Sequence, residues 1–92
     1  MTTEYKIIWH KEALEDLKRL DKPIRQKIFE RVEAYLSKDP IGLGKPLRQN
    51  LLGMFRYRYG DYRIIYIVDI SDKMFTILEV GHRKEIYKYK YK

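Results

Sequence analysis

The 92-residue chain has no cysteine, which excludes disulfide bonds, thiol nucleophiles and cysteine-ligated zinc. It has only two histidines, His10 and His82, and no acidic loop with the spacing of a calcium site. No apolar run is long enough to span a bilayer, and residues 1–5 lack the basic-then-apolar pattern of a signal peptide. We therefore expect a cytoplasmic protein that uses no metal or other cofactor and has no membrane partner.

The chain is also too short for two hydrophobic cores. Hydrophobic residues make up 45% of it and charged residues 36%, a balance typical of a globular domain rather than of a disordered chain. We predict one domain covering residues 1–92.

Positive charge and tyrosine concentrate in the second half of the chain. The formal net charge of +7 divides into +1 for residues 1–40 and +6 for residues 41–92, and seven of the nine tyrosines lie in the second part. Phosphates attract cations, and nucleobases stack on flat rings. This composition favours a nucleic acid or an acidic protein as partner over a merely solvated basic surface.

Hydrophobic periodicity predicts the order βααβββ. Residues 5–9 are β-branched and aromatic, as in a strand, whereas residues 11–20 and 24–36 repeat apolar side chains every three or four positions, as in helices. Asp21 and Pro23 suit the start of the second helix, and Asp39-Pro40 its end. Residues 41–53 contain three glycines and a proline and are predicted to form a loop.

The remaining residues predict a strand meander. Strands at 54–59 and 62–68 flank Gly60-Asp61, a two-residue hairpin signal, and a turn at 71–73 precedes a strand at 74–80. We expect an α+β fold in which a helix hairpin covers one face of an antiparallel sheet and leaves the other face open.

Strand alternation places several cations on the predicted open face. Arg56 and Arg58 alternate with aromatic residues, and Arg63 opens the next strand. In the last strand, alternation puts Phe75, Ile77, Glu79, Gly81 and Arg83 on one face. Ordinary surface decoration would explain each arginine alone, but four from three strands favour a convergent site made of Arg56, Arg58, Arg63 and Arg83.

The order of elements, together with Tyr62-Arg63-Ile64-Ile65-Tyr66, Pro46-Leu47-Arg48 and Val80-Gly81-His82-Arg83-Lys84-Glu85-Ile86-Tyr87, resembles the RelE/ParE toxin superfamily of type II toxin–antitoxin systems. The resemblance implies a RelE-like microbial ribonuclease-type fold with a short C-terminal segment. RelE-like members cleave mRNA in the ribosomal A site, whereas ParE-like members inhibit DNA gyrase without that catalytic set. The RelE-like catalytic positions correspond here to Arg56, Arg58, Arg63, Arg83 and Tyr87.

RNA can be cut without a metal when its 2′-OH attacks the adjacent phosphorus, leaving a 2′,3′-cyclic phosphate and a 5′-OH. Guanidinium groups suit phosphate and transition-state binding, so we assign this role to Arg56, Arg58 and Arg63. Family resemblance places Arg83 at the leaving group. A guanidinium is a poor general base, and the best-known relatives have lysines where this chain has Arg56 and Arg58. His82 is therefore a candidate acid or base, with a structural role as the alternative, and Tyr87 could stack, orient the 2′-OH or transfer a proton.

Further cations are expected to bind ribosomal RNA phosphates: Lys45, Arg48 and Lys84. The alternating Tyr-Lys tail, residues 87–92, could contact RNA or antitoxin, or could be a mobile terminus. The leading prediction is a ribosome-dependent mRNA endonuclease held inactive by an antitoxin that is acidic where it covers the basic face. The alternatives are a non-catalytic gyrase inhibitor and a basic RNA-binding module.

Overall fold

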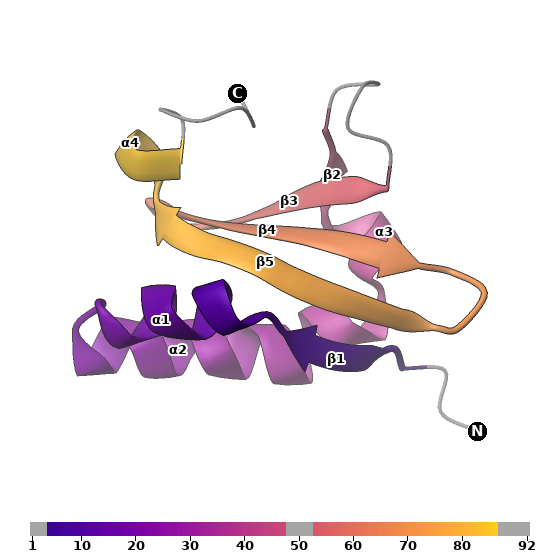
Figure 1. The fold of residues 1–92 in the computed structure, drawn as a ribbon, viewed down its shortest axis with the longest axis horizontal. Helices are drawn as coiled ribbons and strands as arrows, with labels where there is room; N and C mark the ends of the chain where they lie inside the picture. The colour runs from indigo at the N-terminus through magenta and orange to yellow at the C-terminus, as the bar shows by residue number, and fades with distance from the viewer. Residues whose placement is uncertain (1–3, 48–52, 87–92) are drawn as a thin grey trace.

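The computed structural model describes residues 4–47 and 53–86. Figure 1 shows the elements in chain order: β1 (Lys6–Trp9), α1 (Lys11–Lys18), α2 (Lys22–Ala34), the 3₁₀ helix η1 (Leu36–Lys38), α3 (Pro40–Leu43), β2 (Lys45–Pro46), β3 (Met54–Tyr59), β4 (Tyr62–Asp69), β5 (Met74–His82) and α4 (Arg83–Ile86). Within the described ranges, no helix is long and apolar enough to cross a membrane.

The five strands form one sheet in the order β1-β5-β4-β3-β2. The predicted α+β fold is confirmed, but the sheet is not fully antiparallel, because β1 pairs with β5 in parallel. Parallel neighbours need a long connection. Here the chain between β1 and β5 contains the helix pair and the other three strands.

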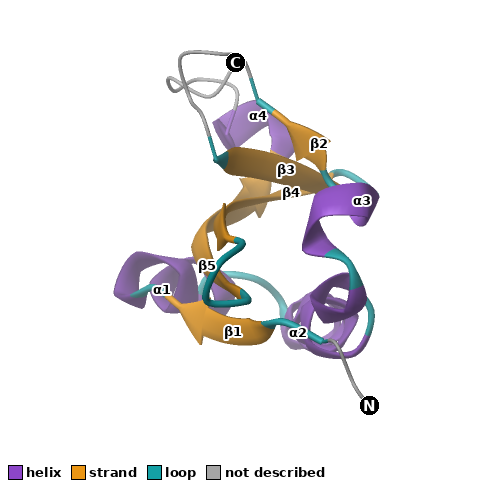
Figure 2. Cartoon of the chain, turned by 90° about the vertical axis from the view of Figure 1, so that its right-hand side faces the viewer, coloured by secondary structure: helices purple, strands orange, loops and turns teal. Residues whose placement is uncertain are grey.

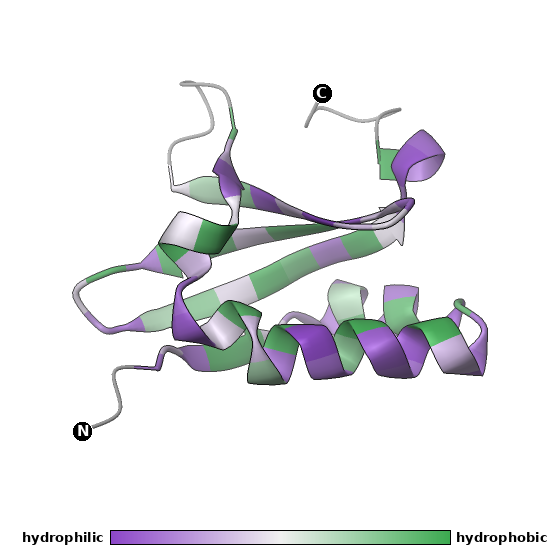
Figure 3. Ribbon diagram, turned by 180° about the vertical axis from the view of Figure 1, so that it is seen from behind, coloured by the Kyte–Doolittle hydropathy of each residue, from purple (hydrophilic) through white to green (hydrophobic). Residues whose placement is uncertain are grey.

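The helices α1 and α2 cover one face of the sheet, as predicted (Figures 1 and 2). Hydrophobic and hydrophilic residues alternate in bands along α2, as expected of a helix with one buried side (Figure 3). The core between helices and sheet buries these side chains: Ala13, Leu17, Ile28, Val32, Leu36, Tyr57, Ile64, Tyr66, Phe75, Ile77 and Val80.

The helix ends differ in how they are capped. His10 caps α1, since its Nδ1 accepts a hydrogen bond from the Glu12 main-chain N–H at 3.1 Å. Asp21 stands at the N-cap of α2 but makes no side-chain capping bond. The second helix ends at Ala34, before the predicted Asp39-Pro40, and Asp39 instead caps α3 by accepting from Gly42 N–H at 2.9 Å.

The segment predicted as a loop, residues 41–53, contributes to the sheet. Its described part includes most of α3 and the two-residue strand β2, which pairs with Phe55 and Arg56 of β3. The hydroxyl of the buried Tyr66 donates to the carbonyl of Pro40 at 2.6 Å and so ties α3 to the centre of the sheet. Hydrogen bonds between residues this far apart in sequence explain why local glycine and proline content indicated only a loop.

An irregularity in β5 reverses the predicted alternation. Ile65 pairs with Glu79 and Tyr66 with Ile77, so Leu78 is left unpaired opposite β4. One extra residue moves the following side chains to the other face. Phe75 and Ile77 therefore lie in the helix-covered core, whereas Glu79 and Gly81 lie on the opposite face, and the predicted shared face was wrong.

The face predicted to be open is partly covered. α4 lies on the side of the sheet opposite to α1 and α2 (Figure 1). Its Ile86 is buried with Ile65 of β4, and Leu47 and Met54 pack against them. This second, smaller cluster covers only part of the face. The rest of the face, along β3 beyond Met54, carries charged side chains.

Candidate functional site: a cationic sheet face

Four cations share the sheet face that points away from the helix pair. Arg56 is opposite Lys45 of β2, and Arg58 is opposite Arg63 of β4. Residues directly opposite each other in a ladder project to the same side. We call this set, Lys45, Arg56, Arg58 and Arg63, the cationic face.

Three members of the cationic face line one shallow hollow. Lys45, Arg56 and Arg58 line it together with Leu43, Gly44 and Tyr57, and its volume is about 320 Å³. Arg58 is exposed, and Arg56 is half-buried. We call this feature the cationic hollow. The sequence predicted the two arginines, and the structure adds the cross-strand pairing that brings Lys45 beside them.

Arg63 differs from its neighbours because its side chain is only 3% exposed. Its guanidinium donates to the carbonyl of Gly60 at 3.0 Å and to that of Tyr62 at 3.1 Å. These bonds hold the tight turn between β3 and β4. The geometry thus gives Arg63 a positioning role in the turn, and its predicted contact with phosphate stays a prediction.

Arg83 begins α4 rather than ending the last strand, because β5 continues to His82. Its main-chain N–H donates to the Asp61 carbonyl at 2.7 Å, and its Nε lies 3.8 Å from Asp61 Oδ1. Both side chains are more than half exposed. Arg83 is therefore placed at the β3–β4 turn, whose carbonyls also accept hydrogen bonds from Arg63.

His82 projects to the helix side of the sheet and not to the cationic face. It pairs with Tyr62, and the two rings meet edge to face with centroids 5.7 Å apart. Its Nδ1 accepts a hydrogen bond from Lys84 N–H at 3.2 Å. This bond gives His82 a local structural role at the start of α4, and its predicted catalytic role stays a prediction.

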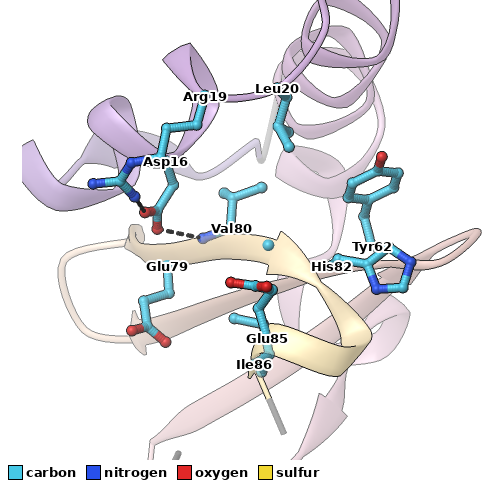
Figure 4. Close-up of a pocket in the computed structure, with 10 residues that line it drawn as sticks. Asp16, Arg19, Leu20, Tyr62, Glu79, Val80, His82, Glu85 and Ile86 are labelled. Carbon is cyan, nitrogen blue, oxygen red and sulfur yellow. Dashed lines mark hydrogen bonds and ion pairs between the residues drawn. The ribbon is translucent and has the colours of Figure 1, made fainter. Parts of the chain in front are cut away.

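His82 lines a second hollow of about 330 Å³ between α1, β5 and α4 (Figure 4). Three carboxylates line this hollow, those of Asp16, Glu79 and Glu85. Asp16 accepts from Val80 N–H at 3.1 Å and from Arg19 at 2.8 Å, so it joins α1 to β5. Three carboxylates against the single guanidinium of Arg19 make this hollow less suited to phosphate than the cationic hollow.

Of the other predicted site residues, the structure describes Lys84. Lys84 is exposed on α4. Arg48, Tyr87 and the Tyr-Lys tail lie outside the described residues.

One cluster of a cation and two aromatic rings was not predicted from the sequence. Arg31 of α2 packs against the rings of Tyr35 and Tyr59. The four-residue spacing of Arg31 and Tyr35 on a helix is a signal that could have been read from the sequence. The contribution of Tyr59 could not, because it depends on how α2 crosses β3.

The arrangement of the cationic face suits one kind of ligand. Guanidinium and ammonium groups in a shallow hollow bind a phosphodiester by charge and by bidentate hydrogen bonds.

Residues 7–87 match the family model described as ParE toxin of type II toxin-antitoxin system, parDE.

The chain belongs to the ParE toxin family.

The relatives of this ParE-family toxin include two proteins of Mycobacterium tuberculosis. Toxin RelG is 37% identical over 84 residues, which cover 91% of this chain and 97% of that protein. Toxin RelE is 37% identical over 76 residues, covering 83% of this chain and 78% of that protein. The predicted membership of the RelE/ParE superfamily is thereby confirmed.

The fold agrees with that of a solved structure from the organism of these two relatives. The toxin–antitoxin complex RelBE2 of M. tuberculosis contains a chain that is 36% identical, with a TM-score of 0.82. The match covers 87% of this chain and 99% of that chain. The five-stranded sheet with packed helices is thus the fold of this family of toxins.

Proposed function

We propose that this ParE-family toxin is an endoribonuclease that cleaves mRNA in the ribosomal A site. The observation that carries the proposal is the convergence of Lys45, Arg56 and Arg58 on one hollow. The names of the two relatives, RelG and RelE, support the RelE-like branch.

The proposed reaction uses the RNA's own 2′-OH as nucleophile. The hydroxyl oxygen bonds to the adjacent phosphorus, and the bond from phosphorus to the 5′ oxygen breaks. The products are a 2′,3′-cyclic phosphate and a 5′-OH. Arg56 and Arg58 bind the phosphate oxygens and stabilise the charge that develops on them. Arg63 orients the β3–β4 turn, and Arg83 at that turn stabilises the departing oxygen.

Proton transfer is assigned to His82 and Tyr87. Guanidinium groups with a pKa above about 12 cannot accept the 2′ proton at neutral pH. His82 lies on the helix side of the sheet, so in this proposal it reaches RNA only if its bond to Lys84 N–H breaks. Tyr87 follows α4 in sequence and is the second candidate. With such weak acid–base groups, we expect slow cleavage of naked RNA and rapid cleavage when the ribosome positions the mRNA.

We also propose that the toxin is inhibited by a cognate antitoxin. The RelBE2 relative is a toxin–antitoxin complex. Lys45, Arg56 and Arg58 favour an antitoxin segment with acidic side chains over the cationic hollow. Lys84 on α4 and Arg48 are further candidate contacts, either to that segment or to ribosomal RNA.

The decisive experiment adds purified toxin to a translating extract and maps mRNA 5′ ends. Cuts in phase with codons are expected from the native chain, and Arg58→Ala should reduce them at least tenfold. Lys22→Ala is the matched control, because Lys22 is an exposed cation on α2, on the opposite side of the sheet. Equal cutting by Arg58→Ala and native toxin would remove the hollow from the mechanism.

The match to the ParE family model supports gyrase inhibition as the second candidate function. A supercoiling assay with purified gyrase distinguishes the two. Trapped gyrase–DNA complexes without mRNA cuts would establish the ParE-like activity. Binding to RNA with neither effect would establish a plain RNA-binding module.

A further inference from the structure

A guanidinium of α2 lies over two tyrosine rings, one of them at the end of β3. The Cζ atom of Arg31 is 5.1 Å from the centroid of the Tyr35 ring and 5.2 Å from that of Tyr59. Arg31 lies in the last turn of α2 and Tyr35 directly follows this helix, whereas Tyr59 is the last residue of β3. We call these three residues the Tyr–Arg platform.

The platform is accessible to a ligand. Tyr35 is 41% exposed and Arg31 is exposed. A hollow of about 350 Å³ adjoins them, lined by Lys27, Glu30, Arg31, Ala34, Tyr35 and Tyr59. Within residues 4–47 and 53–86, no carboxylate lies within ion-pair distance of Arg31. Flat, exposed groups of this kind are the surfaces on which unpaired nucleobases stack.

The platform lies across the edge of β3 from the cationic hollow. Tyr57 lines that hollow, and its ring centroid is 6.3 Å from the centroid of Tyr35. Arg58 and Tyr59 are consecutive in β3, so they project to opposite faces of the same strand. Strand β2 pairs only with Phe55 and Arg56, so within the described residues no strand covers the edge of β3 at residues 57–59.

We propose that the Tyr–Arg platform stacks a base of single-stranded RNA whose phosphates lie in the cationic hollow. The inference rests on the proposed function in taking RNA as the ligand of the hollow. A polynucleotide offers phosphates and flat rings in alternation, which fits a hollow of cations beside a platform of rings. An acidic peptide would satisfy the cations of the hollow but would leave the rings of Tyr35 and Tyr59 without a matching surface.

The test measures binding rather than cleavage. The probe is a single-stranded 2′-O-methyl RNA with 2-aminopurine in place of adenine, which has no 2′-OH to attack phosphorus and whose fluorescence falls on stacking. A second probe of equal length has a phosphodiester backbone with abasic positions. Tyr35→Leu removes the exposed ring, and Tyr35→Phe is the matched control because it retains the ring and removes only the hydroxyl. Thermal unfolding followed by circular dichroism verifies that each variant is folded.

We expect native toxin and Tyr35→Phe to quench the fluorescence and Tyr35→Leu to bind the base-bearing strand about 5- to 150-fold more weakly. The dependence of log affinity on log salt should keep its slope in Tyr35→Leu, since a ring neutralises no phosphate. Arg58→Ala should instead lower that slope by about 0.7, the value for one phosphate of a single strand. Arg31→Lys retains the charge but loses the planar group, so it should weaken binding without changing the slope.

Three results would overturn the proposal: native affinity in Tyr35→Leu, equal affinity for base-bearing and abasic strands, or no measurable binding of the base-bearing strand by native toxin. Loss of antitoxin binding in Tyr35→Leu with unchanged RNA affinity would show a protein-docking surface and would also overturn it. Because the probe cannot be cleaved, absence of mRNA cuts in the translating extract would count against the proposed function and leave the stacking result unaffected.

Discussion

Arg83 contacts Asp61 twice, through a main-chain hydrogen bond of 2.7 Å and through a side-chain approach of 3.8 Å between Nε and Oδ1. The first contact fixes where α4 leaves the sheet, and it survives any change of the side chain. The second joins two exposed side chains at a long distance, where an ion pair contributes little to stability. The Arg83 guanidinium can therefore turn from Asp61 to the RNA phosphate of the proposed reaction at small cost.

Arg83→Ala should abolish mRNA cleavage in the translating extract while leaving the fold intact. The side-chain pair with Asp61 is solvent-screened, so the free energy of unfolding should change by less than about 1 kcal/mol. The measurement combines 5′-end mapping with urea unfolding. Asp61→Asn is the control: it removes the same ion pair and should keep cleavage. Retained cleavage in Arg83→Ala would exclude the side chain from the reaction.

Arg63→Lys should lower the free energy of unfolding by about 1–3 kcal/mol, because the buried Arg63 guanidinium is the planar donor to the carbonyls of Gly60 and Tyr62 and lysine does not reproduce both bonds. Arg58→Lys, at an exposed position directly opposite, should change it by less than about 0.5 kcal/mol. Urea unfolding of both variants gives the comparison. If the two lysine variants are equally stable, the turn does not depend on the Arg63 guanidinium. The expected result would also mean that lost cleavage in an Arg63 variant does not by itself identify a phosphate contact.

Local signals in the sequence were sufficient for the helix pair and the hairpins. Ala13, Leu17, Ile28 and Val32 are buried where the helical period places them. The turn at Gly60-Asp61 also occurs as predicted, with Gly60 at a φ of 59°, where glycine carries no steric penalty. These features could be predicted because each depends on residues that are close in sequence, in one helix or in one hairpin.

Features that depend on distant residues could not be predicted in the same way. The unpaired Leu78 moved Phe75 and Ile77 into the core and Glu79 to the opposite face, and a strict period of two contains no sign of it. The burial of Arg63 follows from hydrogen bonds to a turn, which residue type does not reveal. Sequence therefore grouped Arg56, Arg58 and Arg63 on one face correctly but could not separate the exposed arginine from the buried one.

Gly44→Ala should destabilise the protein by about 1–3 kcal/mol. A Cβ at this position would overlap the Tyr66 hydroxyl and approach its Cζ to 2.9 Å, which would push Tyr66 away from the Pro40 carbonyl. Gly81→Ala is the matched control, since its Cβ would approach Ile86 only to 3.4 Å. The midpoints of thermal unfolding should fall clearly for the first variant and little for the second. Equal midpoints would mean that the contact between α3 and the sheet adjusts without loss.

Tyr66 should make the protein unstable at high pH. Burial raises the pKa of its phenol above the ordinary value of about 10, with smaller contributions from Tyr57 and Asp39. The folded state therefore holds this proton at pH values where the unfolded chain has released it. Tyr66 contributes its full stabilisation below pH 10, and this contribution falls as pH rises above 10, by at most about 1.4 kcal/mol per pH unit.

Tyr66→Phe should be less stable than native toxin at pH 7, by about 1–2 kcal/mol, since the Pro40 carbonyl loses its donor. Between pH 10 and 11.5 the difference should shrink, because the variant has no phenol to ionise. Urea unfolding of both proteins across this range measures the difference directly, and a constant difference would show that Tyr66 does not govern the alkaline limit.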